Sequence, residues 1–244
     1  MAAEPSTRPR VSVVVPVYNE EENLPALLRE IRETLDPEGF SYEVVFVDDG
    51  SRDRSLEVLR GLLPANPMVR VVVFEKNAGQ TAAMDAGLRS ARGEILVTLD
   101  ADLQNDPHDI PLLLREMDRF DVAVGYRAKR RDSLVKKITS RIGNGVRNWA
   151  THEDIIDTGC SLKAFRREAV APLKLLKGMH RFLPTLCRME GFTVTQVKVN
   201  HRPRIHGETK YGVFDRLRAT LPDLLAVRWM QKRVLRYRIR EELP

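Results

Sequence analysis

Hydrophobic and polar positions alternate regularly along the first half of the chain. Short runs rich in valine and isoleucine are separated by longer stretches in which apolar residues recur at spacings of three and four. The short runs are typical of buried strands, and the longer stretches are typical of amphipathic helices. We therefore expect strands at Val11–Val15, Glu43–Val47, Val69–Phe74, Glu94–Leu99 and Val122–Val124, and helices at Glu20–Leu35, Asp53–Leu63 and Gln80–Ala91.

The order of these elements predicts an α/β fold with a parallel sheet. Near-continuous apolar strands that alternate with helices imply a sheet covered by helices on both faces. Asn19 followed by Glu22 has the form of a capped helix start, so we expect the first helix to begin there. Ligands bind at the carboxyl ends of strands in such sheets, and the residues after each strand are therefore the first candidates for a site.

The second half of the chain is less regular. A basic helical stretch is predicted at about Leu134–Trp149, and further α/β elements continue to about Val199. No internal repeat, low-complexity segment or linker in the sequence marks a second globular domain. We expect a single globular domain at residues 8–213, followed by a C-terminal helical segment at residues 214–244.

The C-terminal segment has the pattern of a basic amphipathic helix at Pro222–Arg240. Its apolar residues recur at helical spacing beside a row of basic residues; they are Val227, Met230, Val234 and Tyr237, next to Arg228, Lys232 and Arg236. Such a helix can lie in a membrane interface, where Trp229 would suit the headgroup boundary. It can equally pack its apolar side on the domain or on a second subunit, and both alternatives stay open.

The 244 residues carry a net charge of +6, but the positive charge is concentrated in two segments. Tyr126–Trp149 has a net charge of +7 and Arg202–Arg240 one of +8, which leaves −9 on the remaining residues. This asymmetry indicates an anionic partner, and the alternative is that each segment is a solvated helix face. We do not expect that partner to be nucleic acid, because the sequence has no nucleic-acid-binding motif and binding of that kind would leave the acidic segments described below unexplained.

The chain has no predicted route across a bilayer. Its longest uncharged stretch, Val11–Asn19, has nine residues, whereas a spanning helix needs about 20. The N-terminus lacks the apolar region of a secretory signal, and Cys160 and Cys187 match neither a disulfide framework nor a paired-thiolate zinc site. We expect a reduced, cytoplasmic setting.

Polar residues directly follow four of the predicted strands. They form the segments Pro16–Glu20, Asp48–Ser51, Lys76–Gly79 and Asp100–Gln104. Any one of these segments could be an ordinary turn or helix cap. Two acidic clusters at the same edge of one sheet are electrostatically unfavourable, however, unless a cation or a ligand offsets their repulsion.

Asp100 and Asp102 are separated by one small residue, so in an extended loop both carboxylates can reach one cation. Mg²⁺ and Mn²⁺ are commonly held by one or two carboxylates together with the phosphate oxygens of a substrate. Gln104 offers a neutral oxygen on the same side. We predict a site for Mg²⁺ or Mn²⁺ formed by Asp100, Asp102 and Gln104.

Segments farther along the chain complete a recognisable set. They are Gly125–Arg127, Lys136–Arg141, Asp157–Cys160 and Arg204–Lys210. Together with the four strand-end segments, they resemble the family 2 inverting glycosyltransferases of the GT-A fold, and in particular the dolichyl- and polyprenyl-phosphate sugar transferases. The resemblance covers about residues 10–215, and it implies a Rossmann-like, mixed but mainly parallel sheet flanked by helices.

The resemblance also implies how a nucleotide-sugar donor would be bound. The nucleoside would contact residues after the first two strands, namely Pro16, Tyr18, Glu20, Val47 and Asp49. The diphosphate and its metal ion would contact Asp100, Ala101, Asp102 and Gln104, chiefly Asp102 and Gln104. Arg127, Arg204 and Lys210 would close over the phosphates of donor and acceptor.

For the acceptor phosphate, the resemblance implies contacts with Arg127, Lys136 and Ser140. Lys136 departs from the arginine expected in the dolichol enzymes, which preserves the charge but loses the bidentate geometry. The implied catalytic set is Asp102, Arg127 and Asp157. The five histidines match no metal-ligand spacing, and we predict that they lie on the surface or in loops.

The implied reaction moves a sugar, with inversion, from a UDP- or GDP-sugar to a polyprenyl phosphate. A hydroxyl acceptor needs a carboxylate or histidine base, whereas a phosphate monoester is largely anionic at pH 7 and needs cationic positioning instead. The eight basic residues of Tyr126–Trp149 favour the phosphate acceptor. The alternative is a sugar hydroxyl in polysaccharide or glycolipid synthesis, with Asp157 as the base. We expect peripheral attachment to the inner face of the membrane, either directly or through a membrane-spanning partner subunit or a homo-oligomer.

Overall fold

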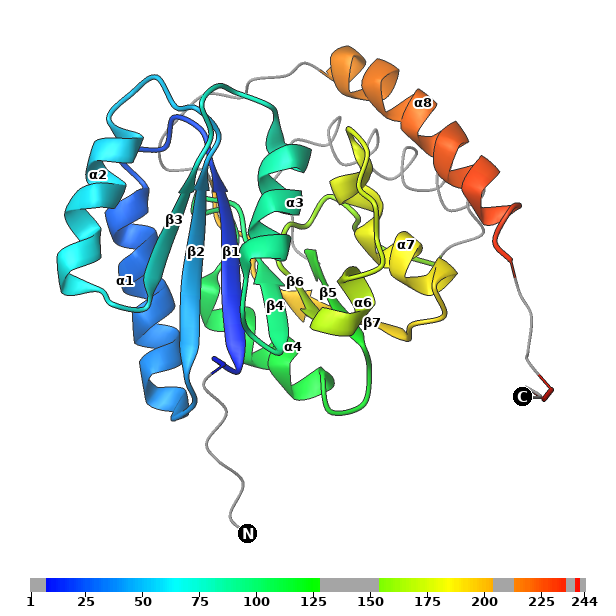
Figure 1. Cartoon of the computed structure of the whole chain (residues 1–244), viewed down its shortest axis with the longest axis horizontal. Helices are drawn as coiled ribbons and strands as arrows, with labels where there is room; N and C mark the ends of the chain where they lie inside the picture. Colours follow the sequence, from blue (N-terminus) through cyan, green and yellow to red (C-terminus); the bar gives the residue numbers. More distant parts are fainter. Residues whose placement is uncertain (1–7, 128–153, 204–212, 236–239, 242–244) are drawn as a thin grey trace, which may run out of the picture.

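The computed structural model describes residues 8–127, 154–203, 213–235 and 240–241. Their strands form one seven-stranded sheet with the order β3-β2-β1-β4-β6-β5-β7 (Figure 1). The strands are β1 (Val11–Val17), β2 (Tyr42–Asp48), β3 (Val69–Val73), β4 (Ile95–Thr98), β5 (Val122–Arg127), β6 (Lys163–Arg166) and β7 (Val194–Val199). Strand β6 is antiparallel to β4 and β5 and the other pairs are parallel, so the prediction of a mixed, mainly parallel sheet is confirmed.

Helices cover both faces of the sheet, as predicted (Figure 1). Apolar side chains of α1, α2 and α4 share one core cluster with the sheet, and those of α3, α6, α7 and α8 share another. The helices are α1 (Leu24–Leu35), α2 (Ser55–Leu62), α3 (Gln80–Ser90), α4 (Ile110–Glu116), α6 (Arg167–Val170), α7 (Leu183–Met189) and α8 (Val213–Gln231), with short 3₁₀ turns η1 (Asp36–Glu38), η2 (Leu63–Ala65), η3 (Pro107–Asp109) and η4 (Met179–Phe182).

Strand β1 lies near the middle of the sheet and is buried on both faces. Val13 and Val15 belong to the cluster beneath α1, whereas Val14 belongs to the cluster beneath α3. Gly87 of α3 packs directly on this strand, because a Cβ atom there would lie 2.3 Å from Cγ1 of Val14. A larger residue would push α3 away from the sheet, and α3 carries several residues of the site described below.

The first helix does not begin where the sequence pattern predicts. Asn19 has a left-handed backbone with φ 55°, and its Oδ1 accepts the backbone N–H of Arg52 at 2.8 Å instead of capping a helix. Helix α1 begins at Leu24, one turn later. The predicted capped start at Asn19 was therefore wrong, because a partner from the next strand's loop occupies the side chain that would have formed the cap.

Helix α8 also differs from the prediction. It begins at Val213, contains Pro222 in its interior, and ends at Gln231 instead of reaching Arg240. Val227 is fully buried on the α7 side, so this side packs on the domain, whereas Trp229 is 60% exposed. Helix α8 ends where its buried contacts end. Leu235 is 83% exposed, and helical turns without packing contacts are only marginally stable.

Apolar residues thus lie on both the packed and the exposed sides of α8, and the predicted single apolar side was too simple. Leu225 is 63% exposed between the buried Leu224 and the partly buried Ala226. Within the described ranges, no helix combines the length and the apolar character needed to cross a membrane.

A buried carboxylate, that of Glu43, links neighbouring segments of the sheet near the amino ends of β1 and β2. Glu43 is 5% exposed, and it accepts hydrogen bonds from Ser12 Oγ at 2.7 Å, Arg92 N at 2.5 Å and Arg70 Nη1 at 3.0 Å. Burial acts to raise the pKa of Glu43, but these hydrogen bonds and the charge of Arg70 outweigh it and hold the pKa below its ordinary value.

We expect Glu43→Gln to lower the free energy of unfolding by about 1–3 kcal/mol at pH 7. A carboxyl whose pKa is depressed by folding stabilises the native state above its unfolded pKa, and this contribution is lost as the pH falls through the folded pKa. The difference in free energy of unfolding between wild type and variant should therefore decrease below a pH of about 4.3. Urea unfolding at a series of pH values measures this difference. Glu33→Gln is the control, because Glu33 forms an exposed pair with Arg29 at 3.8 Å; equal pH dependence of the two variants would contradict the assignment.

Candidate active site

The strand-end segments identified in the sequence meet at one edge of the sheet, the upper edge in Figure 1. Strands β2, β1 and β4 are neighbours and parallel, so their carboxyl ends point the same way. Adjacent strands lie about 4.8 Å apart, which places the ends of β2 and β4 roughly 10 Å from each other. Asp49 and Asp100, which follow these two strands, therefore border the same edge.

Hydrogen bonds tie the loop after β1 to the loop after β2. The backbone N–H of Asn19 donates to Ser51 Oγ at 3.1 Å, and that of Glu20 donates to Ser55 Oγ at 2.8 Å. Tyr18 lies in the same loop and is half-buried, as is Glu20. The two loops are thereby joined, and three of the residues predicted to contact the nucleoside, Tyr18, Glu20 and Asp49, lie in them.

Asp49 shapes the loop that leads into α3. Its carboxylate, 3% exposed, accepts hydrogen bonds from Asn77 Nδ2 at 2.9 Å, Ala78 N at 2.7 Å and Gly79 N at 2.9 Å. Gly50 has φ +65°, and a Cβ atom there would lie 2.6 Å from Asn77 N. Asp49 is thus engaged in holding the loop, and its predicted contact with a nucleoside stays a prediction.

Pro16 and Val47 face each other across β1 and β2. The Val47 side chain is fully buried and packs with Ala83 beneath α3, so a donor contact at this position would fall to the main chain. Its neighbour Asp48 was given no role in the sequence analysis. Asp48 is 1% exposed, and its Oδ1 atom has no hydrogen-bond partner among the described residues. A buried acceptor without a partner is costly and indicates that a ligand donor belongs there.

The acidic segment after β4 turns sharply. Leu103 is buried with φ 57°, a conformation that costs a non-glycine residue about 1–3 kcal/mol and that clusters at functional sites. The turn lets Gln104 N donate to Asp102 Oδ1 at 3.2 Å. Gln80, the first residue of α3, donates from Nε2 to Asp100 Oδ1 at 3.0 Å. The loop held by Asp49 thereby reaches the acidic segment.

The electrostatics of Asp100 fit a cation site. Burial and the neighbouring carboxylate of Asp102 raise the pKa of Asp100, while Ser161, Lys163 and Arg127 act in the opposite direction. A divalent ion between the two carboxylates would relieve their repulsion, and the oxygens are the ligands that Mg²⁺ and Mn²⁺ prefer. Within the described ranges, no third carboxylate, histidine or cysteine completes a group with Asp100 and Asp102, which leaves Gln104 and substrate phosphates as further ligands.

Arg127 and Asp157 form a bidentate ion pair. Arg127 Nε lies 2.6 Å from Asp157 Oδ2, and Nη2 lies 3.0 Å from Oδ1. The Asp157 side chain is 6% exposed and that of Arg127 is 14% exposed. Gly159 N also donates to Asp157 Oδ1 at 3.2 Å. Both oxygens of Asp157 thus accept hydrogen bonds, and the carboxylate positions Arg127 and its own loop; its role as a base stays a prediction.

A polar layer lies beneath the acidic segment. Ser161 Oγ accepts hydrogen bonds from Asp100 N at 3.2 Å and Asn105 Nδ2 at 2.6 Å, and Ser161 O accepts one from Thr98 Oγ1 at 2.6 Å. These bonds fasten both ends of the turn to the segment before β6. The position of Asp100 and Asp102 is thus set by residues about sixty positions later in the chain.

Two residues that the sequence analysis missed border this layer. Lys163 is 4% exposed on β6, and its ammonium donates to the backbone oxygen of Cys160. Burial lowers the pKa of Lys163, against the nearby charges of Cys160, Asp100 and Asp157. The only signal in the sequence was a lone charge within an apolar strand. The second residue is His180, which lies half-buried in η4. The histidines were predicted to lie on the surface or in loops; His180 lies in a short turn and is half-buried because that turn packs against α3.

Four predicted site residues lie outside the described residues. They are Lys136, Ser140, Arg204 and Lys210. Their implied contacts with phosphates stay predictions. The other predicted residues lie at the carboxyl edge, among them Ala101, which is 3% exposed and packs in the core.

A second acidic group lies between α1 and η3. Glu30, Asp106 and His108 bring one ligand atom each within 4.8 Å of one another. Arg202 already compensates this group, with Nη1 2.7 Å from Glu30 Oε2 and Nη2 2.6 Å from Asp106 Oδ1. The guanidinium takes the place that a metal ion would need, so we interpret the group as an ion-pair network.

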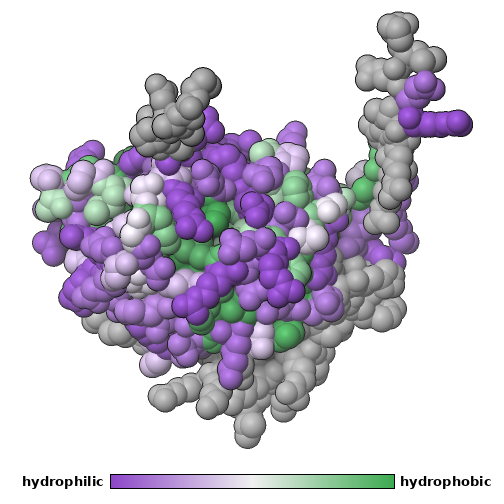
Figure 2. Space-filling view, turned by 90° about the horizontal axis from the view of Figure 1, so that it is seen from below, coloured by the Kyte–Doolittle hydropathy of each residue, from purple (hydrophilic) through white to green (hydrophobic). Residues whose placement is uncertain are grey.

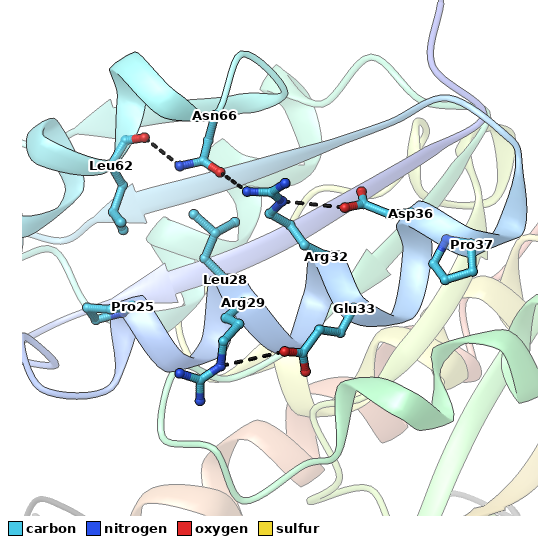
Figure 3. Close-up of a pocket in the computed structure, with 9 residues that line it drawn as sticks. All are labelled: Pro25, Leu28, Arg29, Arg32, Glu33, Asp36, Pro37, Leu62 and Asn66. Carbon is cyan, nitrogen blue, oxygen red and sulfur yellow. Dashed lines mark hydrogen bonds and ion pairs between the residues drawn. The ribbon is translucent and has the colours of Figure 1, made fainter.

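A hollow of about 400 Å³ lies along α1, where Arg32 pairs with Asp36 and Asn66 (Figure 3). Its charged side chains form ion pairs within the hollow, Arg32 with Asp36 at 3.5 Å and Arg29 with Glu33 at 3.8 Å. The face seen from below is largely hydrophilic, with small separate hydrophobic patches (Figure 2). The carboxyl edge is therefore the candidate active site.

Comparison with known proteins gives the family. Residues 12–173 match the model of glycosyl transferase family 2. The chain belongs to this family, which confirms the resemblance drawn from its motifs.

Similar curated proteins act on polyprenyl phosphates. The chain is 37% identical over 228 residues to a dodecaprenyl-phosphate galacturonate synthase of Rhizobium johnstonii, covering 91% of this chain and 67% of that one. It is 40% identical over 205 residues to an undecaprenyl-phosphate 4-deoxy-4-formamido-L-arabinose transferase of Aeromonas hydrophila, covering 83% of this chain and 63% of that one. The chain thus spans about two thirds of the length of these relatives.

Among solved structures, the chain resembles glucosyl-3-phosphoglycerate synthase from Mycobacterium tuberculosis. A complex of that enzyme with Mn²⁺, UDP and glucosyl-3-phosphoglycerate has a TM-score of 0.69 at 19% identity, covering 93% of this chain and 81% of that one. A complex with Mg²⁺ and UDP has a TM-score of 0.66, with the same coverage. This likeness confirms the predicted GT-A fold.

Proposed function

We propose that this protein transfers a sugar from a nucleotide-diphosphate sugar to a polyprenyl phosphate, with a divalent metal ion at the carboxyl edge of the sheet. The observation that carries the choice of acceptor is the pairing of Asp157 with Arg127 at 2.6 Å and 3.0 Å. A hydroxyl acceptor requires a base, and Asp157 was the candidate. Both oxygens of Asp157 already accept hydrogen bonds. A phosphate acceptor brings its own anionic oxygen and needs no base, so it fits this arrangement better than a hydroxyl acceptor does.

The names of similar proteins support the same choice, because those proteins are polyprenyl-phosphate sugar transferases and synthases. Asp100, Asp102 and Gln104 would hold Mg²⁺ or Mn²⁺, which would stabilise the negative charge of the leaving diphosphate. Asp48, with its unpartnered buried oxygen, would accept a hydrogen bond from the nucleobase. Arg127 is positioned by Asp157 and would contact a phosphate of the donor or the acceptor.

A lipid acceptor requires access to a membrane, and we infer that α8 provides contact with it. Leu225 and Trp229 are 63% and 60% exposed on the side that does not pack on the domain. Arg233 lies over the Trp229 ring at 5.2 Å, and Lys232 is exposed beside it. Aromatic and basic side chains in this arrangement suit the headgroup region of an anionic leaflet. Peripheral attachment to the inner face of the membrane follows from this proposal.

The decisive experiment offers the purified protein a panel of UDP- and GDP-sugars with radiolabelled sugar, together with undecaprenyl phosphate and Mg²⁺ or Mn²⁺. We expect label to move into the lipid extract with one donor. Undecaprenol, which lacks the phosphate, is the matched control and should remain unlabelled. Labelling of undecaprenol or of a sugar hydroxyl, with undecaprenyl phosphate inert, would overturn the phosphate acceptor and favour the alternative in which Asp157 acts as a base.

A further inference from the structure

A small hydrogen-bonded group joins η4 to the first turn of α3, next to the candidate active site. Thr81 Oγ1 lies 2.7 Å from His180 Nδ1 and accepts the backbone N–H of Gly178 at 3.0 Å. Gln80, which precedes Thr81, holds Asp100 at 3.0 Å. Two adjacent residues of α3 therefore make the two contacts: Gln80 contacts the acidic segment, and Thr81 contacts His180.

The contact between Thr81 and His180 is compatible with a proton on Nε2. Thr81 Oγ1 accepts from Gly178 N and keeps its own hydrogen, which it can donate to His180 Nδ1. A neutral imidazole that accepts at Nδ1 bears its hydrogen on Nε2. Within the described ranges, no protein group accepts a hydrogen bond from Nε2, so in this tautomer the N–H can donate to a ligand.

The imidazole is neutral under ordinary conditions. Burial lowers the pKa of His180 to about 3, and the positive charges of Arg181 and Lys163 lower it further in the same direction. Although neutral, the ring can still donate a hydrogen bond to an anion, and donors to charged oxygens form the stronger hydrogen bonds.

The turn that carries His180 is held rigidly. Met179 and Phe182, on either side of it, are 2% and 1% exposed. Gly178 has φ +88°, and a Cβ atom there would lie 2.0 Å from the Asp223 carboxylate of α8. The turn that carries the ring is therefore held against α3 and α8 through Gly178, and the ring itself contacts Thr81 of α3.

We propose that the Nε2–H of His180 donates a hydrogen bond to a phosphate oxygen of the substrates bound at the carboxyl edge. Two substrates of the proposed function carry such oxygens, the diphosphate of the donor and the phosphate of the lipid acceptor. His180 is thus a phosphate-binding residue, and Thr81 is a positioning residue that sets its tautomer. This assignment rests on the proposed function.

Two substitutions separate this role from a purely structural one. His180→Gln retains an N–H donor near the position of Nε2, whereas the shorter side chain of His180→Asn places its amide near the position of Nδ1, toward Thr81, and does not reach the position of Nε2. We expect the affinity of His180→Gln for the phosphate-bearing substrate to stay within about threefold of wild type. We expect that of His180→Asn to fall about tenfold to a hundredfold, which is the effect of removing a hydrogen bond to a charged group. The reverse order, or no loss in either variant, would overturn the proposal.

Two measurements identify the phosphate concerned. Calorimetric binding of UDP and of GDP, each with Mg²⁺, reports the donor diphosphate, and the KM for undecaprenyl phosphate reports the acceptor. A loss confined to the first assigns His180 to the donor, and a loss confined to the second assigns it to the acceptor. If the wild-type protein forms no lipid product, the proposed function fails. Nucleotide binding by the two variants would still decide the role of His180. If the wild-type protein binds neither nucleotide, both the proposed function and the role of His180 are overturned.

NMR of the imidazole nitrogens gives a readout that does not depend on activity. Wild type should show His180 protonated at Nε2 and bare at Nδ1. Thr81→Val removes the donor to Nδ1 and should weaken this preference, with unfolding temperature as the control for the fold. A proton on Nδ1 in wild type would overturn the assignment of Nε2 as the donor.

Discussion

Asp102→Asn will abolish sugar transfer while leaving the fold intact. Asparagine has the size of aspartate and still offers an oxygen to Gln104 N, which lies 3.2 Å from Asp102 Oδ1. The turn at Leu103 should therefore persist. The variant lacks the negative charge that would bind a divalent ion, and such an ion supplies several kcal/mol of transition-state stabilisation. We expect kcat/KM to fall by at least about a hundredfold.

The measurement is transfer of radiolabelled sugar over a titration of Mg²⁺ or Mn²⁺, after removal of metal with a chelator. Wild type should regain activity on addition of metal, whereas Asp102→Asn should not. Asp85→Asn is the matched control, because Asp85 pairs with Arg89 at 2.9 Å on the exposed side of α3. Normal metal dependence in Asp102→Asn would remove Asp102 from the metal site.

The second large effect concerns stability. Arg127→Met leaves the Asp157 carboxylate, 6% exposed, without its guanidinium partner, and Asp157→Asn leaves the guanidinium unbalanced. Breaking a buried ion pair on one side costs about 3–5 kcal/mol. We expect each single variant to lose about that much free energy of unfolding in urea, and the double variant to lose clearly less than the sum of the two.

An exposed pair provides the control for this cycle. Arg188 Nη1 lies 2.7 Å from Asp154 Oδ1, but the Asp154 side chain is 75% exposed. Arg188→Met should cost less than about 1 kcal/mol. Additive losses in the Arg127 and Asp157 cycle would show that the two residues do not act as a pair.

Activity of Asp157→Asn separates the two acceptor classes. With a phosphate acceptor, turnover should survive with a modest loss that follows the disturbed position of Arg127. A collapse of kcat with unchanged donor binding would instead identify Asp157 as a general base and favour a hydroxyl acceptor.

Much of the fold could be predicted from the sequence, because local patterns carry it. Alternating apolar strands and helices located β1 to β5 and α1 to α3 within a few residues, and the parallel arrangement of β1 to β4 followed from them, but helix α4 (Ile110–Glu116) was not predicted. The errors arose where a distant partner decided a local structure. Asn19 forms no helix cap because Arg52, from another loop, uses its side chain, and α8 ends at Gln231 because its buried contacts end there.

In the candidate site, too, some residues could be predicted from local patterns and others could not. Asp49, Asp100 and Asp102 could be found because they follow strands, and parallel strands end at one edge. That Arg127 pairs with Asp157, thirty residues away, was not visible in any pattern. Nor was the meeting of Thr81 and His180, which are 99 residues apart in the chain.

The amino-acid sequence by itself determined the order of strands and helices, the edge at which acidic residues gather and the family to which the chain belongs. Only the tertiary structure decided which side chains are already paired and which keep a donor or acceptor for a ligand. The physical reason is that hydrogen bonds and ion pairs at this edge join segments brought together by the sheet, and their partners are distant along the chain.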